Sequence, residues 1–128
     1  MTLRRRRYAS YTPVPGHDVG LLVDHGDAEA TRRSFERIGA GGDLAGWRAL
    51  YGATGRIAAA LWPTVTEPLP RRQDVERAVA RRDDTGGARE ALATLLDRPL
   101  GELIEAHLAH DVTRGVALTD GLIGTFAD

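Results

Sequence analysis

Two histidines near the C-terminal end have the spacing that best fits metal chemistry. His107 and His110 are three residues apart and are followed by Asp111. Residues three apart share a helix face, so the two imidazoles and the carboxylate could bind a divalent metal. The pattern is common, however, and His107 falls on the apolar face of a predicted helix. We therefore expect a hydrogen-bonded histidine at the edge of the core and no metal site.

A second group of acidic and imidazole side chains lies near the N-terminus. His17, Asp18, Asp24 and His25 cluster around a predicted β-hairpin and could act as a general acid and base. No serine, threonine or cysteine nucleophile is placed convincingly beside them, and the ends of hairpins are normally polar. We expect solvated hairpin ends, and the sequence assigns no catalytic residue.

Aromatic and glycine-rich segments are the remaining candidates for ligand binding. Trp47, Tyr51 and Trp62 could stack on a planar ligand, but aromatic residues at helical spacing usually belong to the core. The glycine-rich stretches at 39–42 and 52–55 do not follow a strand with the spacing of a dinucleotide-binding loop. We expect the aromatic residues to pack and neither stretch to cradle a phosphate.

The charge balance argues against a nucleic-acid ligand. All 17 basic residues are arginine, with a run at Arg4–Arg7, and 18 acidic residues leave a formal net charge of −1. Arginines beside a strand can simply face water, so we expect no nucleic-acid binding. The chain contains no cysteine, which excludes disulfides, thiolate nucleophiles and cysteine-ligated metal centres.

Length and hydropathy predict one soluble globular segment. A chain of 128 residues can bury a core, and 42% hydrophobic with 27% charged residues is ordinary for a soluble protein. No apolar run approaches the roughly 18 residues that cross a bilayer, and no apolar segment follows the N-terminal charges. We expect no transmembrane segment and a cytoplasmic location.

The chain changes from strand to helix patterning at about residue 27. Strand formers on both sides of a Pro-Gly turn predict a β-hairpin at 8–24. From 27 to 126 apolar residues recur at helical spacing, and Asp27, Asp43 and Asp111 are the predicted N-caps. The fold class is therefore α+β and mostly helical, in a single segment spanning 1–128. Its five or six short amphipathic helices are expected at 27–38, 43–61, 71–82, 88–96, 99–108 and from 111 onward.

Two sequence blocks carry a family resemblance. The first comprises YASYTPVPG at 8–16 and GLLVD at 20–24, and the second comprises RPLGE at 98–102 and RGVALTDGLIGTF at 114–126. These blocks resemble the central region of bacterial FAD-dependent oxidoreductases related to phytoene dehydrogenase, with the intervening helices in matching order. The resemblance spans nearly the whole chain, but the blocks are not catalytic signatures.

The resemblance implies a fragment of the substrate domain of such an enzyme. In that family the flavin accepts hydride from a bound, largely apolar small molecule. The Rossmann-type nucleotide-binding unit and its glycine fingerprint have no match here, so we expect no tight FAD binding and no activity from this chain alone. The implied partners are the remaining FAD-binding portion, in cis or as a separate chain, and the apolar substrate.

The glycine-rich end of the last predicted helix is the segment that the resemblance implies near the flavin or substrate. Each glycine there weakens the helix by roughly 1 kcal/mol relative to alanine unless close packing is gained. By analogy the lining residues would be Gly121, Leu122, Gly124, Thr125 and Phe126. The alternatives are a stand-alone helical protein-interaction module without catalytic activity, or a small subunit of a split enzyme.

Overall fold

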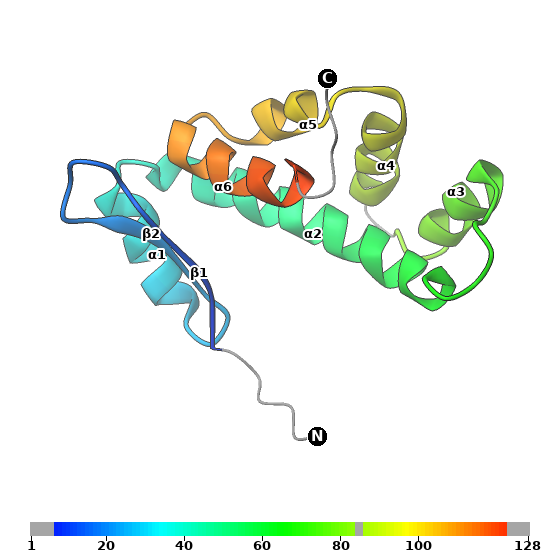
Figure 1. Ribbon diagram of the computed structural model, residues 1–128, viewed down its shortest axis with the longest axis horizontal. Helices are drawn as coiled ribbons and strands as arrows, with labels where there is room; N and C mark the ends of the chain where they lie inside the picture. The colour runs from blue at the N-terminus through cyan, green and yellow to red at the C-terminus, as the bar shows by residue number, and fades with distance from the viewer. Residues whose placement is uncertain (1–6, 84–85, 123–128) are drawn as a thin grey trace. The chain divides into compact units, whose positions relative to one another are not determined.

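The computed structural model describes residues 7–83 and 86–122, with only the backbone described for 120–122. Within these ranges an N-terminal antiparallel β-hairpin is followed by six α-helices (Figure 1), which confirms the α+β, mostly helical fold class. Inside the single segment predicted from the sequence, the structure separates two compact units. One contains residues 1–45 and 108–128, and the other contains residues 46–107. The first unit is therefore built from two stretches that are distant in the sequence.

The hairpin consists of β1 (Tyr8–Pro13) and β2 (Gly20–Asp24), which confirms the prediction for 8–24. Tyr11 lies opposite Leu22 in the antiparallel register. The residues of β1 are exposed or half-buried, whereas Leu21 of β2 has no exposed surface. Only β2 therefore contributes substantially to the core of the first unit.

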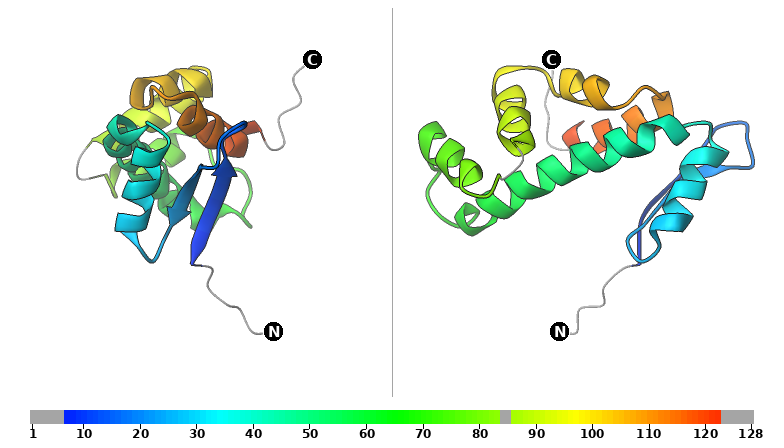
Figure 2. Two further views of the ribbon diagram at one scale, coloured as in Figure 1. Left: turned by 90° about the vertical axis from the view of Figure 1, so that its left-hand side faces the viewer. Right: turned by 180° about the vertical axis from the view of Figure 1, so that it is seen from behind.

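Helix α1 (Ala28–Arg37) packs against β2 (Figure 2), in agreement with the helix predicted for 27–38. The Asp27 carboxylate accepts hydrogen bonds from the amides of Glu29 and Ala30, which is the predicted N-cap. Phe35 is completely buried, and Gly39 after the helix has φ of 79°, a conformation that favours glycine. Local sequence signals therefore set both ends of α1.

Helix α2 (Leu44–Leu61) follows a short 3-10 turn, η1 (Gly41–Asp43). Its buried residues are Trp47, Leu50, Ala53, Ile57 and Ala60. Tyr51 and Ala58, which also recur at helical spacing in this segment, are exposed. The buried face is rotated toward two alanines because a small side chain permits close helix packing although its own hydrophobicity is a weak signal in the sequence.

The remaining helices of the second unit are α3 (Arg72–Ala80), α4 (Gly87–Asp97) and α5 (Leu100–His107). Helix α4 lies beside α3 and contacts α5 (Figure 2), and the connector between α2 and α3 contains one 3-10 turn, η2 (Trp62–Thr64). The buried apolar side chains of these three helices are Val79, Ala88, Ala91, Leu92, Leu103 and Ile104. Leu95 and Leu96 of α4 are exposed by 36% and 45% although both are large apolar residues. No helix in the described ranges has both the length and the apolar character needed to cross a membrane.

A glycine allows the backbones of α2 and α5 to approach closely. A Cβ atom built on Gly46 would lie 1.8 Å from the carbonyl oxygen of His107, far inside van der Waals contact. Any other residue at 46 would force the two backbones apart. No pattern in the sequence predicts this role for Gly46, because its partner is a backbone atom.

Candidate functional site

The segment predicted to line a flavin or substrate lies at the end of α6 (Asp111–Leu122). Gly121 and Leu122 belong to the last turn of this helix, while Gly124, Thr125 and Phe126 lie outside the described residues. The surroundings of these five residues are not among the described features, so their role as lining residues stays a prediction. The beginning of α6, by contrast, is described in atomic detail.

The carboxylate of Asp43 holds the beginning of α6. One oxygen accepts a hydrogen bond from the Ala109 amide at 3.0 Å, and the other accepts from the His110 amide at 2.9 Å and from the Thr113 hydroxyl. Asp43 is 7% exposed and Thr113 is fully buried. Amides at a helix start lack partners within the helix, so a carboxylate there satisfies them and interacts favourably with the helix dipole. Asp43 therefore fixes α6 to the turn η1.

The N-cap roles predicted for Asp43 and Asp111 are wrong. The sequence predicts Asp43 as the cap of the helix directly after it, but its carboxylate binds residues 66 to 70 positions further along. Asp111, predicted to cap the last helix, is exposed in the first turn of α6. The Val112 amide instead donates to Nδ1 of His110 at 3.2 Å. Local spacing cannot show that a distant carboxylate supplies the cap.

The same hydrogen bonds determine the protonation of Asp43. Burial by itself would raise the pKa of this carboxyl group, because it disfavours the charged form. The hydrogen bonds from Thr113, His110 and Ala109 favour the charged form and outweigh burial, so the pKa of Asp43 lies below its ordinary value of 3.8. Asp43 is therefore an ionised structural anchor at neutral pH, with its lone pairs used inside the first unit.

The two histidines considered for metal binding each have a local hydrogen-bond partner. Nδ1 of His107 lies 2.9 Å from the carbonyl oxygen of Leu103, one turn earlier in α5. Nδ1 of His110 accepts from the start of α6, as described above. Over 7–83 and 86–122, no group of three or more histidine, cysteine or acidic side chains is arranged to hold a metal ion. The local partners agree with the hydrogen-bonded histidine expected at 107.

The acidic and imidazole side chains of the hairpin do not form a catalytic group. Asp24 is buried and accepts hydrogen bonds from Nε of Arg7 at 3.0 Å and from the Gly26 amide at 2.8 Å. Burial would raise its pKa, but the hydrogen bonds from Gly26 and Arg7 lower it below the ordinary value. Asp24 is thus a structural group at the junction of β2 and α1. The other three candidates, His17, Asp18 and His25, are exposed.

The aromatic candidates divide between packing and exposure. Trp47 is buried and stacks on Tyr51 with ring centroids 4.4 Å apart, so these two pack, as expected. Trp62, the first residue of η2, is 77% exposed, so the packing predicted for it is wrong. Val65 and Leu69 in the same connector are also exposed, by 69% and 95%. Three large apolar side chains within eight positions of one connector, all facing solvent, are unusual for a surface that stays uncovered.

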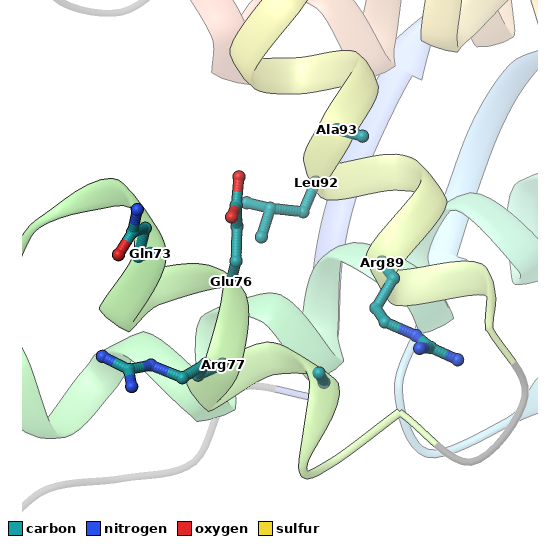
Figure 3. A pocket seen from close by; sticks show the side chains of 7 residues that line it. Gln73, Glu76, Arg77, Arg89, Leu92 and Ala93 are labelled. Carbon is teal, nitrogen blue, oxygen red and sulfur yellow. The ribbon is translucent and has the colours of Figure 1, made fainter.

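A groove of about 540 Å³ lies between α3 and α4 (Figure 3). In the figure Glu76 and Leu92 extend toward one another, whereas Arg77 points away from α4. Glu76 is paired with Arg72, and Arg77 is paired with Asp74. The lining, which is Gln73, Glu76, Arg77, Ala80, Arg89, Leu92 and Ala93, contains no nucleophilic or imidazole side chain. The groove therefore offers shape but no convergent catalytic chemistry.

The described residues do not fit the pyrophosphate of FAD. A dinucleotide needs free amides at a helix N-terminus that follows a strand, and among the described elements only the step from β2 to α1 has that order. There the Asp27 carboxylate already occupies the amides of Glu29 and Ala30. A negative side chain in that position repels a phosphate, so this helix start cannot act as the dinucleotide site.

Comparison with known proteins places the chain inside longer relatives. It is 38% identical over 130 aligned positions to the uncharacterized proteins Rv0897c of Mycobacterium tuberculosis and Mb0921c of Mycobacterium bovis. The match covers 98% of this chain and 23% of each relative, so the chain spans about a quarter of their length. No protein-family model matches the chain. No solved structure matches it either. The chain thus aligns with one segment of each of these longer proteins.

Proposed function

We propose that this chain is part of the substrate domain of an FAD-dependent oxidoreductase related to phytoene dehydrogenase. The match along 98% of the chain to only 23% of its relatives supports the part of the proposal that makes the chain a segment of a longer protein. The oxidoreductase part is supported by the resemblance of the sequence blocks at 8–16, 20–24, 98–102 and 114–126. A segment of this kind contributes walls to a substrate site and leaves cofactor binding to the rest of the polypeptide. When bound, the flavin of such an enzyme accepts hydride from the substrate.

The exposed apolar side chains support a segment that is covered in its full context. Trp62, Val65 and Leu69 face solvent although burial of each large apolar side chain would contribute roughly 1.5 to 3 kcal/mol. In a longer polypeptide this connector would contact another part of the protein or the apolar substrate. A stand-alone helical interaction module, the alternative function, would use the same surface for a separate partner.

Two proteins distinguish these functions by their flavin content. The first is the 128-residue chain, and the second is the M. tuberculosis relative with its matched segment replaced by this chain. We expect the chain alone to lose all FAD on dialysis and the chimera to retain about one FAD per polypeptide. Stoichiometric FAD binding by the chain alone would contradict an incomplete enzyme. A folded chimera without flavin would contradict the oxidoreductase and favour the interaction module.

A further inference from the structure

The two outer edges of the β-hairpin differ in whether their backbone groups have hydrogen-bond partners. On the outer edge of β2, the Leu22 amide donates to Oγ of Ser34 at 2.6 Å, and the Ser34 hydroxyl donates to the Gly20 carbonyl at 3.0 Å. The Asp24 amide donates to Oγ1 of Thr31 at 2.9 Å. Two hydroxyl groups of α1 thus take the place of a neighbouring strand, and this edge is closed to further pairing.

The outer edge of β1 has no such cover. The Val14 amide donates to the Val19 carbonyl, and bonded and non-bonded pairs alternate along an antiparallel ladder. Thr12 and Leu21 therefore form a hydrogen-bonded pair. The backbone amide and carbonyl of Tyr11, one position away, point to the side of β1 that faces away from β2. The same alternation holds in β2. The backbone amide of Leu22, the partner of Tyr11, also points away from the ladder and donates to Ser34.

Nothing in the described chain contacts these outward groups through a hydrogen bond. The Tyr11 backbone groups take part in none of the hydrogen bonds that link β1 to the rest of the described residues. Tyr8 and Tyr11 are 52% and 61% exposed, and Figure 2 shows β2 between β1 and α1. A two-stranded hairpin with an open, aromatic edge is marginal by itself and is the usual template for strand addition.

The open edge of β1 is short, which limits the kind of strand that can pair with it. A bulge between Tyr8 and Ser10 interrupts the register at one end, and Pro13 at the other end has no amide to donate. By the same alternation Tyr8, whose partner Asp24 bonds to Thr31, also faces outward, but the bulge breaks its register with Tyr11. On the regular side of the bulge an incoming strand can pair fully with the backbone of Tyr11 and form one further hydrogen bond to the Pro13 carbonyl. Its contact would thus be a few residues long, which suits a strand tethered to the same polypeptide better than a free peptide.

We propose that the outer edge of β1, centred on Tyr11, receives a third strand from the polypeptide that surrounds this segment in the longer protein. The aligned relatives carry the matching segment in 23% of their length, so most of the polypeptide that could supply the strand lies outside the match. The inference rests on the part of the proposed function that makes the chain a segment of a longer protein. It does not depend on redox chemistry.

Hydrogen–deuterium exchange on the chain alone and on the chimera tests the added strand. The Leu22 amide, bonded to Ser34, reports hairpin folding and should be protected in both proteins. The Tyr11 amide should exchange quickly in the chain alone and at least about tenfold more slowly in the chimera. Fast exchange of Tyr11 beside a protected Leu22 in the chimera would overturn the proposal. So would protection of Tyr11 in the chain alone that rises with concentration, because a second copy would then be the partner.

A matched pair of variants isolates the outward amide. Tyr11→Pro and Tyr11→Thr both lose the aromatic ring, but only proline also loses the amide. Proline also fixes φ and restricts Ser10 in both proteins, so the difference between the two variants is compared across the two proteins. The thermal midpoint of Tyr11→Pro should fall further below that of Tyr11→Thr in the chimera than in the chain alone. The same difference in both proteins would contradict the proposal. If the chimera does not protect Leu22, the same exchange experiment on the intact M. tuberculosis relative and its excised matching segment decides the question. The flavin content of the chimera is measured separately. A chimera that lacks flavin but protects the Tyr11 amide would contradict the proposed redox function and leave the added strand supported.

Discussion

The Thr113 hydroxyl donates a hydrogen bond to the carboxylate of Asp43 across 70 positions of sequence. Together with the amides of Ala109 and His110 it gives the carboxylate three donors in a site that is almost completely buried. The two stretches of the first unit are joined there by a charged group. This relationship makes the stability of the unit sensitive to substitution of Asp43.

Replacing Asp43 with alanine should lower the free energy of unfolding by roughly 3 kcal/mol. The substitution removes charge-assisted hydrogen bonds and leaves buried donors without an acceptor. Urea unfolding followed by circular dichroism measures the change. Asp18→Ala, which alters an exposed aspartate in the hairpin turn, is the control and should change stability by less than about 0.5 kcal/mol. Equal effects of the two substitutions would show that the Asp43 contacts contribute nothing specific.

The same carboxylate should make stability depend on acidic pH. The pKa of Asp43 is lowered in the folded state below the ordinary 3.8, so the unfolded chain binds the proton more readily as pH falls. The contribution is complete above about pH 5 and is lost as pH falls through 3.8 toward the lower folded-state value. Urea midpoints from about pH 6 to about pH 3 should therefore fall more steeply for the natural chain than for Asp43→Asn. Parallel curves would assign the acid sensitivity to other carboxylates.

Gly46→Ala should destabilise the second unit severely. The added methyl group would lie 1.8 Å from the His107 carbonyl oxygen, so α2 and α5 must separate, at a cost of roughly 3 kcal/mol or more. Gly55→Ala in the same helix has open space around its Cβ position and should be neutral or stabilising by up to about 1 kcal/mol. Thermal unfolding of the two variants gives the comparison. A similar midpoint for both would mean that α2 and α5 are not in close backbone contact.

Ser34→Ala should weaken the attachment of α1 to the hairpin. The Leu22 amide and the Gly20 carbonyl would both lose their partner, which costs roughly 1 to 3 kcal/mol. Exchange of the Leu22 amide should accelerate along with the loss of stability. Thr119→Ala removes an exposed hydroxyl that bonds only within α6 and should have little effect. An unchanged Leu22 exchange rate in Ser34→Ala would argue against the closed edge of β2.

Sequence patterns predict the local parts of this fold and miss the contacts between distant segments. Asp27 and the apolar period around Phe35 specify α1 because both signals lie within a few residues. Asp43 shows the opposite case, since an aspartate before a helix has the same local appearance whether it caps that helix or a later one. The close contact at Gly46 cannot be predicted for a related reason, because it involves a backbone carbonyl oxygen, which every residue has. The lining role predicted for Gly121 and Leu122 depends on family resemblance alone and stays a prediction.

The discontinuous first unit has a consequence for biosynthesis. A ribosome adding 5–20 residues per second needs about 4 to 14 seconds to travel the 70 positions from Asp43 to Thr113. Throughout that interval the nascent chain holds an ionised aspartate whose eventual donors have not yet been synthesised. Docking of α6 onto this carboxylate must therefore be a late, post-emergence event, and the hairpin with α1 must wait for it in a partly assembled form.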